Sequence, residues 1–243
     1  QELYSLISAV SKLYLSQRTN AHVEEVQTWQ RAVLAIAHQE SFFSHYRLPQ
    51  NTNNIHIMRG DQGHGHGLLQ IDDRWHFIAV ENGQAWALLD NMVYALDIYY
   101  SNWQKAKSTN CIDQRSWEEV ARGAYSGYNG GSSKTCRFKN PRDKWHRNDQ
   151  AFYEKYQNQS WLDYVWDPSA PPNTDYECHV LDQPCAPPSD DPINLSYGVF
   201  LYTNSVSCLH LDGKKYCYMG SKNLKCFHQL LNPTAPEPPI HSI

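Results

Sequence analysis

Two stretches decide the fold of this chain: VEEVQTWQRAVLAIAHQESFF at residues 23–43 and GDQGHGHGLLQID at residues 60–72. The first carries apolar residues at helical spacing, namely Val23, Val26, Trp29, Val33, Ile36 and Ala37. This period predicts an amphipathic helix with one face in a core. The second combines four glycines with two aspartates, which predicts a loop that permits unusual backbone angles and the close approach of a ligand.

The flanking sequence predicts that the first two thirds of the chain is mainly α. Helical spacing covers three further segments, at residues 3–14, 85–103 and 149–166. Ser116 and Glu119 match a capping box, in which each side chain accepts a hydrogen bond from a free backbone amide. Residues 45–67 contain Pro49 and no sustained period, so they predict a long loop with room for a short hairpin.

The composition changes at residues 167–173, DPSAPPN, which predicts a proline-rich linker. The two expected domains are a mainly α domain at residues 1–167 and a small β-rich domain at residues 168–243 that ends in a disordered tail. Strands are predicted at residues 197–206 and 208–219, the second interrupted by a turn at residues 212–214.

Five of the seven cysteines lie between Cys178 and Cys226. This density predicts disulfides and an oxidising compartment, so we expect a secreted or periplasmic protein whose signal peptide has been removed. Cys208 and Cys217 flank the predicted turn and are candidates for a cross-strand bridge, although either could pair with Cys226. No Cys-x-x-Cys pair is present, which disfavours a zinc ribbon. The odd number leaves one thiol unpaired or intermolecular.

The composition also limits the partners. A net charge of -4 gives no basic footprint for nucleic acid, and the cations at residues 142–147 form a short cluster mixed with acid. The longest aliphatic run, residues 33–37, is far shorter than the roughly 20 residues that cross a bilayer, so we expect no membrane insertion. The 8 Trp, 16 Tyr and 7 Phe favour an aromatic-lined groove, although core packing explains most single aromatics.

Glu40 is the first candidate for a chemical role. It follows Ile36 by four positions and Val33 by seven, so it emerges from the apolar face of the predicted helix. Burial disfavours a charged carboxylate and raises its pKa. A glutamic acid that stays protonated near neutral pH is suited to protonate a glycosidic oxygen. On spacing alone, a surface glutamate that reaches water is equally compatible.

Three motifs, in this order, resemble the signature of goose-type lysozymes and their relatives, the soluble lytic transglycosylases. They are Glu-Ser-x-Phe from residue 40, Gly-Asp-x-Gly-x-Gly-x-Gly-Leu-Leu-Gln-Ile-Asp from residue 60, and Gly-Tyr-Asn-Gly-Gly from residue 127. The resemblance covers roughly residues 23–131. It implies a lysozyme-like α-helical (α+β) catalytic domain at residues 1–167, whereas residues 168–243 have no counterpart in the vertebrate enzymes.

The resemblance also implies roles for individual residues. Glu40 takes the position of the catalytic acid, and Asp61 and Asp72 take those of the aspartates that position the attacking water. Substrate-binding positions are matched by Gln70, His76, Tyr128 and Asn129. Because transglycosylases typically lack the two aspartates, the chain resembles the hydrolase branch.

We therefore expect a secreted lysozyme that cleaves the β-1,4 bond of peptidoglycan with inversion, which requires about 6.5 to 9.5 Å between acid and base. The alternatives are a lytic transglycosylase that forms 1,6-anhydro products and a non-catalytic glycan-binding protein. We expect a monomer that binds peptidoglycan glycan strands without a cofactor. Some lysozyme relatives act on deacetylated peptidoglycan, and the sequence leaves this preference open.

A metal site is the remaining alternative. Four histidines could join Asp61 as zinc ligands, and they are His56, His64, His66 and His76. The chain has no His-Glu-x-x-His helix, and two histidines in a glycine-rich loop are more often polar groove residues. We therefore expect no metal.

Overall fold

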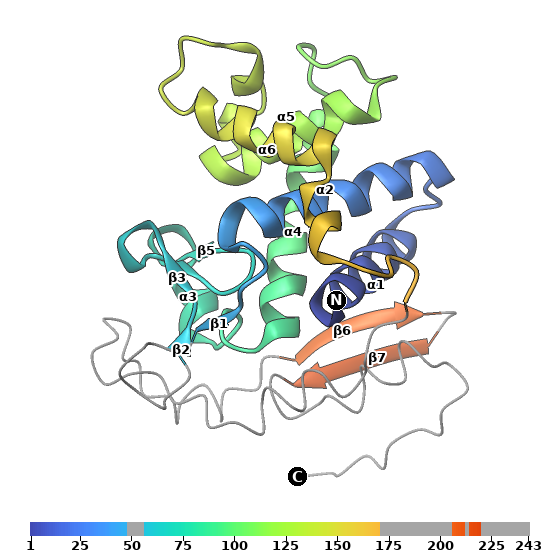
Figure 1. The fold of residues 1–243 in the computed structure, drawn as a ribbon, viewed down its shortest axis with the longest axis vertical. Coiled ribbons are helices and arrows are strands. Elements are labelled where there is room, and N and C mark those ends of the chain that lie inside the picture. The colour runs from blue at the N-terminus through green and yellow to red at the C-terminus, as the bar shows by residue number, and fades with distance from the viewer. Residues whose placement is uncertain (48–55, 171–205, 212–213, 220–243) are drawn as a thin grey trace.

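The computed structural model describes residues 1–47, 56–170, 206–211 and 214–219. Within these ranges the protein is mainly helical, as predicted (Figure 1). The helices are α1 (Glu2–Arg18), α2 (Val23–Ser41), α3 (Asp73–Glu81), α4 (Leu88–Ala106), α5 (Trp117–Gly130) and α6 (His146–Asn158). The strands are β1 (Tyr46–Arg47), β2 (His56–Ile57), β3 (Arg59–Gly60), β4 (Gly65–His66), β5 (Ile71–Asp72), β6 (Val206–Leu211) and β7 (Lys214–Met219). None of the described helices is long and apolar enough to cross a membrane.

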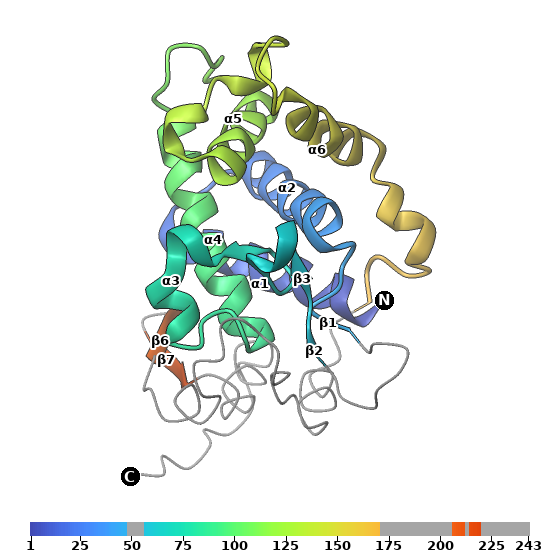
Figure 2. The same ribbon diagram turned by 90° about the vertical axis from the view of Figure 1, so that its left-hand side faces the viewer.

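Helix α2 lies at the centre of the helical part and packs against α1, α5 and α6 (Figure 1, Figure 2). Trp29 of α2 is fully buried and stacks on Tyr14 of α1, with 5.9 Å between ring centroids. It meets the edge of Trp103 of α4 at 5.3 Å, and its Nε1 donates to the backbone oxygen of Ser11 at 2.9 Å. The predicted apolar face is therefore confirmed from Trp29 to Ala37, whereas Val23, at the start of the helix, is 74% exposed.

Two details of the predicted helices are wrong. The Ser116 hydroxyl accepts a hydrogen bond from the Glu119 amide at 3.2 Å, as in a capping box. The Glu119 carboxylate, however, accepts from the amide of Asp113 at 2.7 Å, which lies in the preceding turn. The helix expected over residues 149–166 ends early, because Gln159 adopts a left-handed φ of 48°.

Residues 45–67 are more regular than the predicted loop. Their described part contains the antiparallel pair β1–β2 and two strands of the antiparallel sheet β3–β4–β5. In this sheet Gly60 lies opposite Gly65, which in turn lies opposite Asp72. A Cβ atom at Gly60 or Gly65 would come within 2.3 or 2.4 Å of the Gln70 amide oxygen. The glycines thus make room for a side chain, and the local sequence period does not reveal that contact.

Strands β6 and β7 pair antiparallel (Figure 1), and residues 212–213 of the predicted turn between them lie outside the described residues. The register of the two strands places Cys208 opposite Cys217, the arrangement that the predicted cross-strand bridge requires. The predicted strand at residues 197–206 lies outside the described residues except for Val206, which begins β6. The expected tail also lies outside them, so the division into two domains stays a prediction.

A disulfide joins Cys111, between α4 and α5, to Cys136, which follows α5. Both cysteines lie outside the cysteine-rich segment in which the sequence predicts bridges. The bond ties the chain after α5 to the connection before it. It thereby anchors residues 131–148, many of which line the groove described next.

Candidate active site

A groove with a cavity volume of about 1270 Å³ is lined by the end of α2, the β3–β5 sheet, α3, α5 and the segment that follows α5. All seven residues predicted for the site line it, and they are Glu40, Asp61, Gln70, Asp72, His76, Tyr128 and Asn129. They come from segments up to 89 residues apart in the chain, so the fold brings together what the sequence motifs separate.

Glu40 lies near the end of α2 and is partly buried at the groove. The hydroxyl of Tyr125 donates a hydrogen bond to its Oε1 at 3.0 Å. Burial raises the pKa of Glu40 to about 7, against the opposing effects of the Tyr125 hydrogen bond and the Arg137 charge. The charge of Asp61 raises it further. Tyr125 is itself held by stacking on Phe152 at 4.2 Å between ring centroids. A carboxyl group with this pKa is partly protonated near neutral pH.

The backbone beside the groove contains several left-handed residues that are not glycine. Phe42 and Phe43 have φ values of 53° and 58° and turn the chain directly after the helix that carries Glu40. Asp61 and Gln70 also adopt positive φ values, of 46° and 51°. Such residues each cost about 1 to 3 kcal/mol and persist where the surrounding packing fixes them, often at functional sites.

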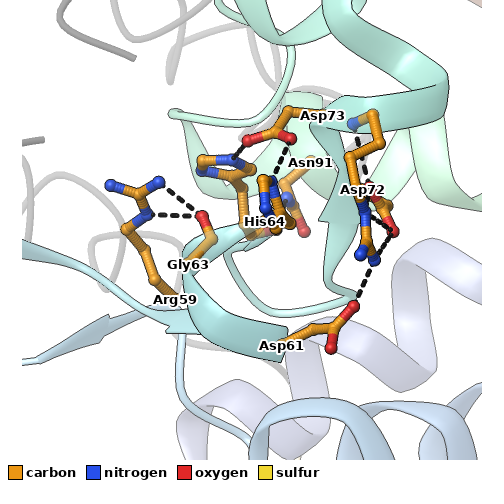
Figure 3. A network of polar contacts seen from close by, with 9 residues as sticks. Arg59, Asp61, Gly63, His64, Asp72, Asp73 and Asn91 are labelled. Carbon is orange, nitrogen blue, oxygen red and sulfur yellow. Dashed lines mark hydrogen bonds and ion pairs between the residues drawn. The ribbon is translucent and has the colours of Figure 1, made fainter. Parts of the chain in front are cut away.

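Asp61 and Asp72 are joined by Arg74 (Figure 3). Asp72 caps α3, where its Oδ1 accepts from the Arg74 amide and from the Arg74 Nε, both at 2.9 Å. The Nη2 of the same arginine contacts Asp72 at 2.5 Å and also bonds to Asp61. Burial opposes the charge of Asp72, but the hydrogen bonds and charge of Arg74 outweigh it and lower the pKa of this carboxyl. Asp72 is thus held as a carboxylate.

Gln70 lies across the glycine pair of the sheet. Its Nε2 donates to the backbone oxygen of Gly67 at 2.7 Å, and its Oε1 occupies the space that side chains at Gly60 and Gly65 would fill. The glycines were expected to permit unusual backbone angles and the close approach of a ligand. Their nearest function in the fold is to admit Gln70, which itself lines the groove.

His76 lies on α3, where its φ of -125° departs from helical geometry. Its Nδ1 is 2.9 Å from the hydroxyl of Tyr94, and the two rings meet edge to face. Burial lowers the pKa of His76, and the nearby charge of Asp72 opposes this effect. A neutral imidazole held in this way can donate or accept a hydrogen bond at its free nitrogen.

Tyr128 and Asn129 come from the end of α5. The Tyr128 hydroxyl donates to the backbone oxygen of Leu69, which ties α5 to the segment that carries Gln70. The Oδ1 of Asn129 accepts from Arg137 Nη2 at 2.9 Å and from Asn148 Nδ2 at 3.2 Å. Because both donors point at its oxygen, the amide nitrogen of Asn129 is the group left to contact a ligand.

A buried ion pair supports Asn129 from behind. Arg137 Nε and Nη2 each lie 2.8 Å from the carboxylate of Asp149, and both side chains are about 1% exposed. The Ser126 hydroxyl completes the network with a 2.9 Å bond to Asp149. A bidentate pair with this geometry fixes the guanidinium plane and so the orientation of the asparagine amide.

The histidines of the glycine-rich segment do not line the groove, contrary to expectation. His64 Nδ1 and His66 Nε2 each lie 2.8 Å from one oxygen of Asp73, which is buried at the start of α3 (Figure 3). These contacts hold β4 against α3. Among the described residues, no group of three or more His, Cys, Asp or Glu side chains could hold a metal ion.

Several residues that line the groove were not predicted from the sequence. Trp75, 79% exposed, and Trp145, 42% exposed, line the groove together with Tyr125, Arg74 and Arg137. Tyr125 had a usable signal, since it precedes Tyr128 by three positions on the helix that Ser116 begins. The two tryptophans carried no such signal, because no local sequence pattern distinguishes an exposed tryptophan in a groove from a buried one.

The site as a whole combines three features. A partly buried glutamic acid with a raised pKa lies in the same groove as two aspartates that an arginine joins. Exposed tryptophans and fixed amides surround them. Comparison of the chain with known protein families, curated proteins and solved structures gives no match.

Proposed function

We propose that this chain is a secreted, peptidoglycan-cleaving glycoside hydrolase of the lysozyme type, akin to goose-type lysozymes and soluble lytic transglycosylases, with a lysozyme-like fold at residues 1–167. The observation that carries the proposal is the contrast between two carboxyl groups in one groove. Burial raises the pKa of Glu40 to about 7, whereas Arg74 keeps that of Asp72 low. Paired carboxyl groups with diverging pKa values are the usual basis of acid and base roles in glycosidases.

The chemistry assigned to each carboxyl follows from its protonation. Glu40 donates its proton to the oxygen of the β-1,4 bond as the bond to the anomeric carbon breaks. A water molecule attacks that carbon from the opposite face, and Asp72 or Asp61 accepts its proton. The anomeric configuration is inverted, and the products are two shorter strands.

Substrate contacts in this proposal come from the fixed groups around the acid. The Asn129 amide and Gln70 supply hydrogen bonds to sugar substituents, and Tyr128 and His76 border the same groove. Trp75 offers an apolar ring face to a pyranose, because a largely exposed indole gains from being covered by a ligand.

The test is the release of reducing sugar from purified sacculi by the wild-type chain and by Glu40→Gln. Loss of the proton donor is expected to lower turnover by about a hundredfold or more. The matched control is Glu24→Gln, an exposed glutamate in the first turn of the same helix, which should leave turnover unchanged. Wild-type turnover in a folded Glu40→Gln protein would contradict the assignment.

One observation favours a second candidate, a lytic transglycosylase. Because Arg74 lowers the pKa of Asp72, this carboxylate is a weak base, which favours a route without a second base: the C6 hydroxyl of the cleaved sugar attacks the anomeric carbon and gives its proton to Glu40, which has just protonated the leaving oxygen. The products would then end in 1,6-anhydro sugars. Product masses distinguish the two reactions, since hydrolysis adds one water for each bond cleaved.

A further inference from the structure

One wall of the groove is strongly basic. Residues 132–147, SSKTCRFKNPRDKWHR, contain six Lys or Arg and one acidic residue, in a chain whose net charge is -4. Lys134, Lys144 and Trp145 of this segment line the groove. We call these three residues the basic wall, together with Arg147, which lies beside the Trp145 ring but outside the groove lining. The basic wall carries positive charge, whereas the β3–β5 side of the same groove carries the carboxylates of Asp61 and Asp72.

Some cations of this segment are already paired with carboxylates. The pairs are Arg137 with Asp149 at 2.8 Å, Lys139 with Glu119 at 2.6 Å and Lys134 with Asp143 at 3.6 Å. Lys144 and Arg147, by contrast, have no carboxylate partner among the described residues, and their cationic groups lie 5.1 and 5.5 Å from the ring centre of Trp145. Two exposed, uncompensated charges and a half-exposed indole therefore form one continuous surface.

The basic wall is held in place by the fold. The disulfide at Cys136 anchors its segment, and Asp143 accepts a 2.9 Å hydrogen bond from the Trp145 amide. That hydrogen bond lowers the pKa of Asp143, and the charges of Lys134 and Arg137 lower it further. The same positive potential acts on any other anion that enters this end of the groove.

We infer that the basic wall is a subsite for carboxylate groups carried by the glycan strand, on the lactyl substituent of muramic acid or on the peptide attached to it. This inference rests on the proposed function, which places a peptidoglycan strand in the groove. The cations attract the carboxylates, and Trp145 covers the apolar part of the substituent. Because Asp61 and Asp72 lie elsewhere in the groove, the uneven charge also favours one orientation of the strand.

The test compares binding of two forms of one ligand by calorimetry. Soluble glycan strand fragments are used as isolated or after carbodiimide coupling has converted their carboxylates to neutral amides. All proteins carry Glu40→Gln, so the strands stay intact. The double variant Lys144→Gln/Arg147→Gln is compared with Lys105→Gln/Arg115→Gln, which removes the same charge from exposed positions that do not line the groove.

The expected result is that Lys144→Gln/Arg147→Gln weakens binding of the carboxylated strand about tenfold, while the control pair and the amidated strand show no such loss. The weakening should diminish as salt is added, because exposed charges are screened. Equal affinity of all proteins for the carboxylated strand would overturn the subsite but leave the proposed function standing. Failure of every protein to bind either strand would overturn the proposed function itself.

Discussion

Arg74 contacts the carboxylates of both Asp61 and Asp72, although these two residues lie 11 positions apart. The contact links the segment after β3 to the start of α3. Hydrogen bonds to Asp72 and Asp61 raise the pKa of Arg74 further, so its charge is constant at every pH at which the protein functions. The arginine therefore lowers the pKa of Asp72 and is not itself titrated.

Removal of Arg74 should change the pH dependence of cleavage. In the proposed mechanism the wild-type protein needs charged Asp72 and protonated Glu40, so we expect the acidic limb to follow the lowered pKa of Asp72 and the alkaline limb to lie near pH 7. In Arg74→Gln the pKa of Asp72 rises, and the acidic limb should move to higher pH while the alkaline limb stays. The dependence of kcat/KM on pH measures the position of both limbs. Arg115→Gln is the control, and an unmoved acidic limb in Arg74→Gln would contradict the role of the arginine.

Asp90 is a second buried carboxyl, in the first turn of α4 and outside the groove lining. It is 3% exposed, its Oδ1 has no hydrogen-bond partner among the described residues, and burial raises its pKa to about 7. A carboxyl whose pKa is higher in the folded than in the unfolded state destabilises the fold as pH rises above the unfolded value. No catalytic role follows from this position.

The variant Asp90→Asn should therefore be more stable than the wild-type protein at high pH. The difference in the free energy of unfolding is expected to be small at pH 4 and to grow to about 2 to 4 kcal/mol at pH 8. Thermal unfolding at several pH values measures it, with the exposed Glu24→Gln as control. A difference that does not change with pH would show that Asp90 is charged in the folded state.

Among the elements, the β3–β5 sheet leaves space at Gly60 and Gly65 for the Gln70 side chain, which lines the groove. Gly65→Ala should push the Gln70 side chain aside rather than unfold the sheet, because the three atoms nearest to the new Cβ atom all belong to that side chain. We expect KM to rise about tenfold, the loss of roughly one hydrogen bond to substrate. Gln70→Ala should show the same rise, and the double variant should be no worse than either single one.

Gly67 provides the contrast within the same sheet region. It has a φ of 72°, and a Cβ atom there would lie 2.5 Å from Asn91 Nδ2 and 2.7 Å from the His45 ring. Both neighbours are buried and hydrogen-bonded, so Gly67→Ala should lower the melting temperature while Gly65→Ala does not.

Additive effects of Gly65→Ala and Gln70→Ala on KM would contradict the prediction for Gly65, because they would show that the glycine acts independently of the glutamine.

The elements differ in how far the sequence predicts them. Helix α2 follows from an apolar period, which is local information, and this period places Glu40 on the apolar face without deciding whether it is buried. Helix α3 was not predicted, because it has only nine residues and its apolar side chains follow no helical period: Trp75 and Phe77 are exposed, whereas Ala79 and Val80 are buried. The bridge formed by Arg74 and the space filled by Gln70 depend on contacts between strands, and such contacts are set by the tertiary structure rather than by any local pattern.

At the scale of the whole molecule, Gln1 and Asp167 close the helical part on itself. The Gln1 side chain donates to the backbone oxygen of Asp167 and accepts from its amide at 3.3 Å. This contact joins the two ends of residues 1–167, and the division from residues 168–243 stays a prediction. Residues 168–243 carry no predicted site residue, and we expect them to act as an accessory module that contacts the cell wall.

A fragment of residues 1–167 tests this division. It should fold with a melting temperature close to that of the full chain and should cleave soluble glycan strands at the full-length rate. Its action on intact sacculi should be several-fold slower, because the accessory module is lost. A fragment that cannot fold would show instead that residues 168–243 belong to the same structural unit.

The most direct test of the central claim is digestion of purified sacculi in ¹⁸O-water, followed by mass analysis of the soluble fragments. The wild-type chain is expected to release fragments with one ¹⁸O at each new reducing end, and Glu40→Gln is expected to release essentially no labelled fragments. Hydrolysis by Glu40 as general acid is contradicted if wild-type fragments lack the label and end in anhydro sugars, or if the folded Glu40→Gln protein releases labelled fragments at the wild-type rate.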